Sequence, residues 1–231
     1  MIVDEIFQCI EMFENPANAR GMERFGIFTD KIYGLTTPEI KRIAREVKKQ
    51  TKKRHELAQE LWKTGVYEAR AIAFLIDDPQ KVTNEQMESW AADFDNWAIC
   101  DGTCCYLFCR TGPAYEKAFS WAEREEEFVK RAGFSLMAYL AIHDKKAPDE
   151  RIAQFLPVIE SKSDDDRNFV KKAVNWALRQ IGKRNLALNK LAIETGEKIK
   201  KRNSKAARWI AADALRELKS EKIQERLKRK K

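Results

Sequence analysis

Trp97 and Asp101 lie four residues apart in the segment FDNWAICD, residues 94–101, where an indole and a carboxylate could act together. Side chains at positions i and i+4 share one face of an α-helix, so a helix here would point both groups in the same direction. A carboxylate beside an aromatic π-face suits a cation, or a reaction centre that becomes positively charged. The pair is therefore either a patch of core or a site.

A sequence repeat connects this pair with later segments. The segments FVKRA, beginning at Phe128, and FVKKA, beginning at Phe169, match almost letter for letter at a spacing of 41 residues. A period of about 40 residues of paired helices is typical of HEAT-type solenoids. Aligning the related segments gives a first series of equivalent positions, with steps of 27, 34, 41 and 36 residues: Arg70, Trp97, Arg131, Lys172 and Arg208.

A second series stands four residues after the first, on the same predicted helix faces: Phe74, Asp101, Ser135, Trp176 and Ala212. Equivalent helices of stacked repeats lie about 10 Å apart, so we expect both series to line one strip on a concave wall. Trp97 and Trp176 share this strip with Lys and Arg side chains, which are costly to bury without a partner. We therefore interpret the strip as a solvent-accessible groove rather than as part of a dry interior. Tryptophans in helices usually pack in the core, and we assign to it Trp62, Trp90, Trp121 and Trp209.

The elements that must position these residues are helices. Apolar residues recur every three or four positions, no strand-like alternation appears, and turn residues interrupt the pattern at 36–38, 77–79, 111–113, 147–148 and 182. We therefore predict an all-α fold, a HEAT-like superhelix with a concave basic groove. Because no linker sequence occurs, we expect a single domain over residues 1–231, with a basic helix and tail at about 219–231.

Composition limits the function classes. The 231 residues carry a net charge of +8, and residues 197–231 hold fourteen Lys and Arg against five Asp and Glu. That excess fits either a phosphate-binding face or a solvated helix.

No apolar run approaches the roughly 20 residues of a membrane span, and the N-terminus lacks the lysines of a signal peptide, so we expect a cytoplasmic protein. Four of five cysteines fall within residues 100–109, and we expect them to be small buried side chains rather than metal ligands.

Six segments carry a resemblance to a known family: GLTTPEIKRIAREV (34–47), ELWKTGVYEAR (60–70), FDNWAICD (94–101), EFVKRAGFSLMAYLA (127–141), RNFVKKAVNWALRQIGKRN (167–185) and ARWIAADALREL (207–218). They resemble the DNA alkylation repair family, the AlkD-like HEAT-repeat DNA glycosylases, most specifically in NFVKKAVNWALRQ. The resemblance implies excision of N3- and N7-alkylated purines from double-stranded DNA, leaving an abasic site, with no metal or organic cofactor. It also implies a bacterial-type protein that is associated with the nucleoid when bound to DNA.

The family's site consists of a Trp and an Asp on one helix, an Arg from a later repeat and a second Trp. Residue by residue these fall on Trp97, Asp101, Arg131 and Trp176, which the repeat also places on one strip. An alkylated purine is a cation that leaves without a general acid, and positive charge then develops on the deoxyribose. We expect Asp101 to stabilise that charge or orient the attacking water, the indoles to flank the sugar and lesion, and Arg131 to bind a phosphate.

Further cations could hold the duplex through salt-dependent, sequence-independent phosphate contacts: Arg70, Lys172, Lys183, Arg184 and Arg208. No separate pocket motif for an extruded base is present, so we expect an open groove that acts on labile cationic bases and spares neutral ones. Polar capping repeats, rather than partner subunits, close a solenoid, and we therefore expect a monomer.

Two other functions compete with excision. A non-catalytic binder of DNA structures would use the same scaffold, and a HEAT-type protein scaffold would present its basic strip to an acidic partner. Asp101 favours excision, because a carboxylate in the groove gives no electrostatic advantage to a protein that only binds DNA. The alternation of basic and aromatic side chains favours either DNA function over the protein scaffold.

Overall fold

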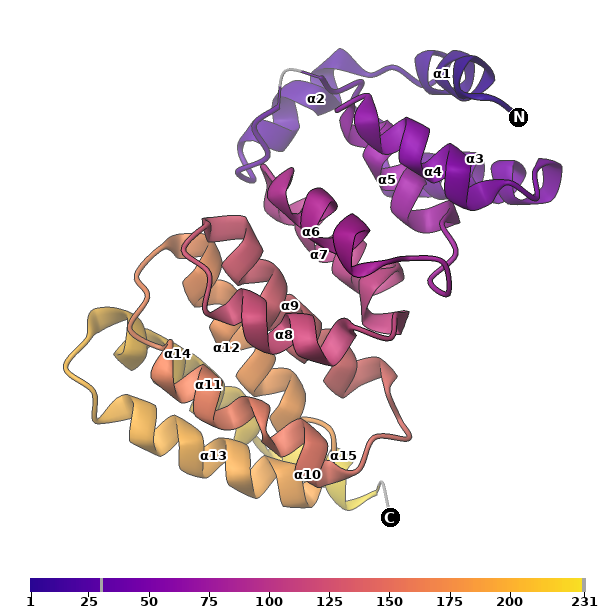
Figure 1. Ribbon diagram of the computed structural model, residues 1–231. Coiled ribbons are helices and arrows are strands. Elements are labelled where there is room, and N and C mark those ends of the chain that lie inside the picture. Colours follow the sequence, from indigo (N-terminus) through magenta and orange to yellow (C-terminus); the bar gives the residue numbers. More distant parts are fainter. Residues whose placement is uncertain (30, 230–231) are drawn as a thin grey trace. The chain divides into compact units, whose positions relative to one another are not determined.

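The computed structural model of the protein describes residues 1–29 and 31–229, and every regular element in that part of the chain is a helix (Figure 1). The prediction of an all-α fold is therefore confirmed. The helices divide into two compact units, Met1–Pro113 and Ala114–Lys231. The single domain over residues 1–231 stays a prediction. Residues 230 and 231 of the expected basic tail lie outside the described residues.

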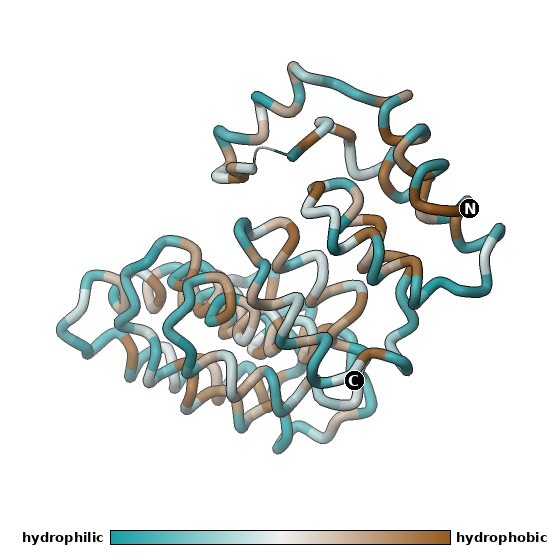
Figure 2. Tube along the Cα trace, turned by 45° about the horizontal axis from the view of Figure 1, so that its top comes forward, coloured by the Kyte–Doolittle hydropathy of each residue, from teal (hydrophilic) through white to brown (hydrophobic). Residues whose placement is uncertain are grey.

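The first unit contains these helices: α1 (Val3–Glu11), α2 (Pro16–Glu23), α3 (Thr37–Gln50), α4 (Arg54–Lys63), α5 (Tyr67–Ile76), α6 (Asn84–Ala92), α7 (Trp97–Tyr106) and the 3-10 turn η1 (Phe108–Arg110). The second unit contains α8 (Ala114–Ala122), α9 (Glu127–His143), α10 (Asp149–Ala153), α11 (Phe155–Ser161), α12 (Asn168–Gly182), α13 (Leu186–Lys200), α14 (Lys205–Leu218) and α15 (Glu221–Lys228). Figure 2 shows hydrophobic residues recurring along the helices of both units, as amphipathic packing requires. Within residues 1–29 and 31–229, no helix is long and apolar enough to cross a bilayer.

Helix α3 begins at the break that the sequence predicts. The backbone N–H and the hydroxyl of Thr36 both donate to Oε2 of Glu39, each at 2.7 Å. Pro38 stands in the first turn of α3, where a backbone N–H has no acceptor within the helix. The N–H that proline lacks therefore costs the helix no hydrogen bond. The two bonds from Thr36 lower the pKa of Glu39, so the cap is made by the ionised carboxylate.

The five positions of the first series all fall within the first five residues of a helix. Helix α5 packs on α3 and α7 in the first unit, and α12 packs on α9 and α14 in the second. Phe128 and Phe169, which mark the repeat in the sequence, are in contact, with ring centroids 5.2 Å apart. In the second unit, the sequence repeat therefore corresponds to stacked helices.

Three of the four tryptophans assigned to the core are buried. Trp62 and Trp90 stack in the first unit, with ring centroids 4.0 Å apart and an interplanar angle of 5°. Trp121 is fully buried in the second unit. For Trp209 the assignment is wrong, because its side chain is 42% exposed. The ammonium of Lys171 lies 5.3 Å from the Trp209 ring centroid, as a surface cation–π contact.

The face of α14 that packs against the core does not include Trp209. Ala207, Ile210, Ala211 and Ala214 are buried, and their spacing of three and four residues defines one stripe. Trp209 lies outside that stripe, between Ala207 and Ile210. The exposure of this indole is therefore set by which face of α14 packs, which residue type alone does not reveal.

A buried carboxylate fixes the segment that precedes α3. Glu68 in α5 is fully buried and accepts backbone N–H bonds from Tyr33 at 3.0 Å, Gly34 at 2.7 Å and Leu35 at 3.1 Å. Gly34 has a φ of +82°, and a Cβ there would lie 2.2 Å from the carbonyl oxygen of Asn15. Glu68 therefore ties α5 to a turn that only glycine can complete.

Two helix glycines permit close packing between helices. A Cβ on Gly133 of α9 would lie 2.5 Å from the backbone nitrogen of Ala122 in α8. A Cβ on Gly102 of α7 would lie 2.5 Å from Cζ of Phe74 in α5. The first contact is with rigid backbone, so α8 and α9 can approach this closely only without a side chain at Gly133.

We expect Glu68→Ala to lower the free energy of unfolding by about 2–4 kcal/mol, because three buried N–H groups lose their acceptor. Urea denaturation followed by circular dichroism measures this loss. Glu60→Ala, at an exposed position of the neighbouring α4, is the control and should change stability by less than about 0.5 kcal/mol. Equal stabilities for the two variants would contradict the role of Glu68.

We expect Gly133→Ala to destabilise the protein by about 1–3 kcal/mol, although alanine is the better helix former, because its Cβ meets the backbone of α8. Gly21→Ala, in α2, is the matched control. No atom lies within 4 Å of the added Cβ there, and we expect a gain of up to about 1 kcal/mol. Urea midpoints that shift in the same direction for both variants would be inconsistent with close packing at Gly133.

Candidate functional site

Helix α7 begins at Trp97 because Asn96 caps it. The side-chain oxygen of Asn96 accepts the N–H groups of Ala98 and Ile99, each at 3.0 Å. These bonds satisfy two of the backbone donors that a helix N-terminus leaves unpaired. Trp97 is thus the first residue of the helix, and Asp101 stands one turn later on the same face. Both side chains are half-buried, so neither is sealed inside the core.

A loop that the sequence analysis missed contacts Trp97. The indole Nε1 donates to the carbonyl oxygen of Phe25 at 2.8 Å, in the segment between α2 and α3. Ile27 is buried and anchors this segment, whereas the flanking Phe25 and Phe28 are 71% and 68% exposed. Gly26 between them has a φ of +77°. A glycine framed by aromatic residues, in RFGIF, is the sequence signal that could have located this loop.

The cysteines beside Asp101 pack as small apolar side chains. Cys100 and Cys104 are fully buried. Burial raises the pKa of the Cys104 thiol, and the neighbouring Cys100 and the charge of Asp101 raise it further. The thiol therefore stays protonated at neutral pH. No group of three or more His, Cys, Asp or Glu in the described ranges is arranged to hold a metal ion.

Arg131 bridges two helices of the second unit. It lies in α9, its side chain is 7% exposed, and its Nη1 donates to the carbonyl oxygen of Phe169 at 2.7 Å. Phe169 belongs to the first turn of α12, so the guanidinium links the N-terminal ends of the two helices. This bond holds Arg131 in a defined position, and part of its donor capacity is used within the protein.

Trp176 is held on α12 by contacts on two sides. The half-buried ring meets Tyr139 of α9 edge-on, with centroids 4.8 Å apart and an interplanar angle of 85°. When the Gln180 amide is oriented so that its oxygen faces the indole, Trp176 Nε1 donates to it at 2.8 Å and Lys183 Nζ donates at 3.1 Å. These contacts restrict the rotation of the indole.

The four residues predicted to form the catalytic site fall into two pairs. Trp97 and Asp101 share one face of α7 in the first unit, and Arg131 and Trp176 lie on the adjacent α9 and α12 in the second. Arg131 contacts Phe169 and Trp176 contacts Tyr139, so each of them bridges α9 and α12. The assembly of both pairs into one site, and their roles in chemistry, stay predictions.

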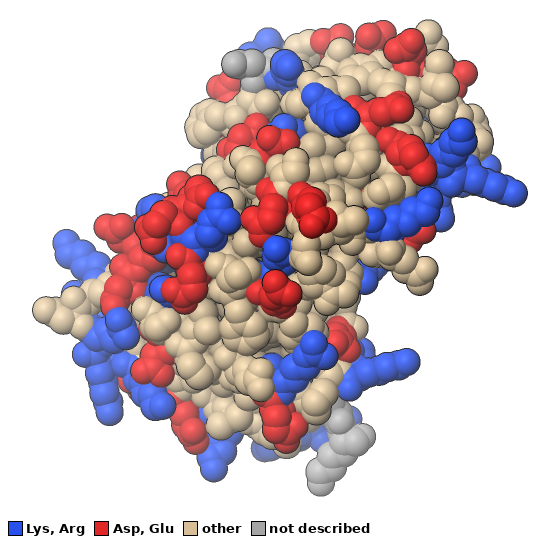
Figure 3. Space-filling view, in the orientation of Figure 1, with Lys and Arg blue, Asp and Glu red and all other residues tan. Residues whose placement is uncertain are grey.

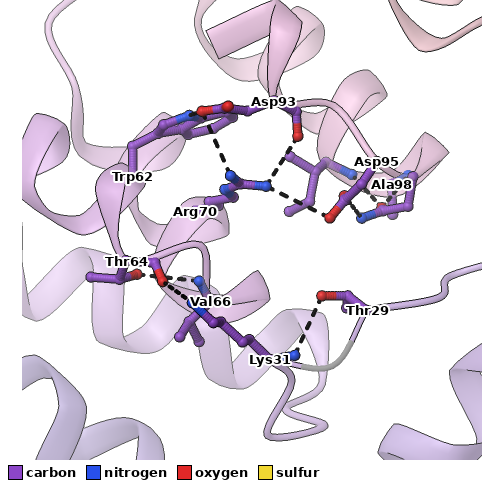
Figure 4. A network of polar contacts seen from close by, with 11 residues as sticks. Thr29, Lys31, Trp62, Thr64, Val66, Arg70, Asp93, Asp95 and Ala98 are labelled. Atoms are coloured by element: carbon purple, nitrogen blue, oxygen red, sulfur yellow. Dashed lines mark hydrogen bonds and ion pairs between the residues drawn. The ribbon is translucent and has the colours of Figure 1, made fainter. Parts of the chain in front are cut away.

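Arg70 is held by an ionic network within the first unit (Figure 4). Its Nη1 donates to the carbonyl oxygen of Asp93 at 3.1 Å and lies 3.7 Å from a carboxylate oxygen of Asp95. The guanidinium carbon is 5.2 Å from the ring centroid of Trp62. The side chain is only 12% exposed. Its contacts therefore tie α5 to the segment before α7, and little of its surface is accessible to a phosphate.

Lys183 and Arg184, which follow α12, are also engaged within the second unit. Arg184 donates to the carbonyl oxygens of Ala141 at 3.0 Å, Asp144 at 2.7 Å and Ala147 at 2.8 Å. Lys183 pairs with Glu217 at 2.9 Å. Their side chains are 14% and 9% exposed, respectively. Arg184 therefore closes the turn after α9, and Lys183 joins α12 to α14.

Lys172 and Arg208 have a different environment. Both are exposed, near the N-terminal ends of the adjacent helices α12 and α14, and neither forms an ion pair within residues 1–29 and 31–229. Figure 3 shows basic and acidic side chains interspersed on the face drawn, so net charge alone does not locate a phosphate-binding surface. Of the five cations predicted to hold DNA, these two are the best placed to contact a phosphate.

The fold is similar to that of a solved structure described as "a new family of proteins related to the HEAT-like repeat DNA glycosylases with affinity for branched DNA structures". The two chains superpose with a TM-score of 0.76 and 21% sequence identity, over 94% of this chain and 95% of the other. The likeness confirms the predicted HEAT-like helical repeat as the fold.

Sequence comparisons identify the family. Uncharacterized proteins of Listeria innocua serovar 6a and Listeria monocytogenes serovar 1/2a are 27% and 25% identical to this chain over 135 residues. The match covers 58% of this chain and 59% of each relative, which is less than two thirds of their length. Over residues 8–218, the chain matches the family described as DNA alkylation repair enzyme. The chain therefore belongs to the DNA alkylation repair enzyme family.

Proposed function

We propose that the protein is a DNA glycosylase that excises cationic N3- or N7-alkylated purines from duplex DNA. The observation that carries this proposal is the half-buried carboxylate of Asp101, one helical turn from the indole of Trp97. Membership of the DNA alkylation repair enzyme family supports it. The similar solved structure adds support for a DNA-binding scaffold.

The proposed reaction needs stabilisation of positive charge rather than a general acid. The bond between C1′ and the purine nitrogen breaks, its electron pair goes to the cationic base, and the base leaves as a neutral molecule. Positive charge develops on the deoxyribose, where the Asp101 carboxylate stabilises it. Water then attacks C1′ and loses a proton, which gives an abasic site. Asp101 also orients that water.

The indoles act as fixed platforms for the cationic sugar and lesion. Trp97 is held by its bond to the Phe25 carbonyl, and Trp176 is held by Tyr139 and Gln180. An indole face stabilises a nearby cation by about 0.5–2 kcal/mol, depending on desolvation. Because the rings are already oriented, little conformational entropy is lost when DNA binds.

In this proposal, Lys172 and Arg208 are the main side chains that bind DNA phosphates. Both are exposed and without a carboxylate partner in the described part of the chain. Arg131 is only 7% exposed and donates to the Phe169 carbonyl, so in this proposal it acts mainly by holding α9 against α12, and a contact with a phosphate stays a prediction. Arg70, Lys183 and Arg184 act mainly by holding the helices that present the other residues.

A non-catalytic reader of DNA structure is the second candidate. The affinity for branched DNA ascribed to the similar solved structure favours it. Asp101 argues for excision, since an anionic side chain in a DNA groove opposes binding unless positive charge develops beside it. Release of the modified base separates the two candidates directly.

We expect Asp101→Asn to slow excision about 100-fold or more, because the amide keeps the size of the carboxylate and removes its charge. The measurement is single-turnover release of 7-methylguanine from a methylated duplex. Asp4→Asn, which removes a charge from an exposed position of α1 in the same unit, is the matched control and should release the base at nearly the wild-type rate.

A uracil-containing duplex tests the dependence on a cationic base, and we expect no release from it. Wild-type protein that binds DNA and releases no methylated base would refute excision. If that protein also bound a four-way junction more tightly than a duplex, the second candidate would replace the first. Slow release by both Asp variants would assign the effect to folding rather than to Asp101.

We expect Lys172→Gln combined with Arg208→Gln to weaken duplex binding. The slope of log K against log salt should become less steep by about 0.9 for each phosphate contact removed. The comparison is Lys183→Gln combined with Arg184→Gln, which removes the same charge from side chains held inside the second unit. That variant should lose mainly thermal stability. Equal salt slopes for the two variants would contradict this division of roles, and fluorescence anisotropy at several salt concentrations measures them.

A further inference from the structure

A groove of about 640 Å³ lies on the first unit, and neither Trp97 nor Asp101 lines it. It is formed by α3, α5 and α7, and Tyr106 at the C-terminal end of α7 lines its floor. Tyr106 lies nine residues after Trp97 and five after Asp101, which is about 13 Å and about 8 Å along the helix axis, and it projects from a different side of the helix than either residue. The groove is therefore separate from the candidate site at the N-terminal end of the same helix.

One wall of the groove is positively charged. Lys41, Arg45 and Lys48 stand at positions i, i+4 and i+7 of α3, so they share one helix face. They span about 10 Å along the axis, which matches roughly three nucleotides of a stacked strand at 3.4 Å each. None of the residues that line the groove is an Asp or a Glu.

These three cations lack the carboxylate partner that Lys49 of α3 has. Lys49 pairs with Glu46 on the same helix, at 2.9 Å. By contrast, Lys41, Arg45 and Lys48 form no ion pair with a carboxylate within residues 1–29 and 31–229. Partial burial lowers the pKa of Lys48, and the charges of Arg54 and Arg110 lower it further. Arg54 and Arg110 therefore add positive charge beside Lys48, and a bound anion would offset it.

The floor of the groove is apolar and partly aromatic. Ala44 and Leu75 line it beside Tyr106, whose ring is parallel to that of Phe74, with centroids 6.0 Å apart. Lys41 Nζ donates to the Tyr106 hydroxyl at 2.8 Å, which joins the cationic wall to the floor. The base faces of a duplex are stacked on one another, so its backbone offers no base to the aromatic ring on the floor. An unpaired strand presents both phosphates and exposed base faces.

We propose that this groove binds single-stranded DNA, with phosphates on Lys41, Arg45 and Lys48 and a base on the apolar floor. Such a strand would be the unpaired arm of a tailed or branched DNA. This binding does not require excision at Asp101, so it goes beyond the proposed glycosylase activity and can be tested apart from it.

The test compares three fluorescein-labelled DNAs by anisotropy: a blunt duplex, the same duplex with an eight-nucleotide unpaired tail, and a free single strand. The groove variant combines Lys41→Gln, Arg45→Gln and Lys48→Gln. Its control combines Lys49→Gln, Lys52→Gln and Lys53→Gln, which removes three charges from the same helix end and the turn after it, outside the groove.

We expect the groove variant to bind the tail and the free strand at least tenfold more weakly, and to bind the blunt duplex within about twofold of wild type. The control should keep the preference for the tailed duplex. Leu75→Glu places a carboxylate on the floor while all three cations remain, and it should also weaken binding of the tail.

Three results would overturn the proposal. Equal losses for the two triple variants would show an effect of net charge alone. An equal loss for blunt and tailed DNA would assign the groove to duplex binding. Wild-type protein without a preference for the tailed duplex would leave the groove with no role in binding an unpaired strand. Circular dichroism and thermal melting establish that each variant is folded.

Discussion

The close approach of neighbouring helices is the constraint on which the rest of the structure depends. Gly102 lets α7 approach the Phe74 ring of α5, and Gly133 lets α9 approach the backbone of α8. Helices at this distance can pack in few registers, because side chains must fill the space between them at nearly crystalline density. Once the register is set, Cys100 and Cys104 of α7 are committed to the core, and Trp97 and Asp101 remain half-buried beside them.

Packing also divides the cations into two groups. Arg70 and Arg184 donate to backbone carbonyls at turns, where unpaired acceptors would otherwise be buried at a cost of about 1–3 kcal/mol each. Lys172 and Arg208 occupy equivalent positions of the repeat, yet they face solvent. The net charge of +8 therefore overstates the basic surface that a nucleic acid could meet, and the location of each cation is more informative than the total.

Helix α7 connects the two features with the clearest chemistry in the first unit. Its N-terminal turn carries Trp97 and Asp101, and its last residue, Tyr106, forms part of the cationic groove. A carboxylate suits developing positive charge, whereas unpaired cations beside an apolar floor suit a strand with exposed bases. A DNA repair protein that used both ends of one helix would bind a lesion and an unpaired arm through a single rigid element.

The sequence by itself determined the helices and the pairing of Trp97 with Asp101, because helix period, caps and i, i+4 spacing are local properties of the chain. It also determined the repeat, since Phe128 and Phe169 meet when equivalent helices stack. Only the tertiary structure decided that Trp209 is exposed, that Arg184 closes a turn, and that Phe25 holds the Trp97 indole. Each of these depends on partners distant in the sequence. The groove beside Tyr106 has the same origin, because three helices create it and no single segment encodes its walls.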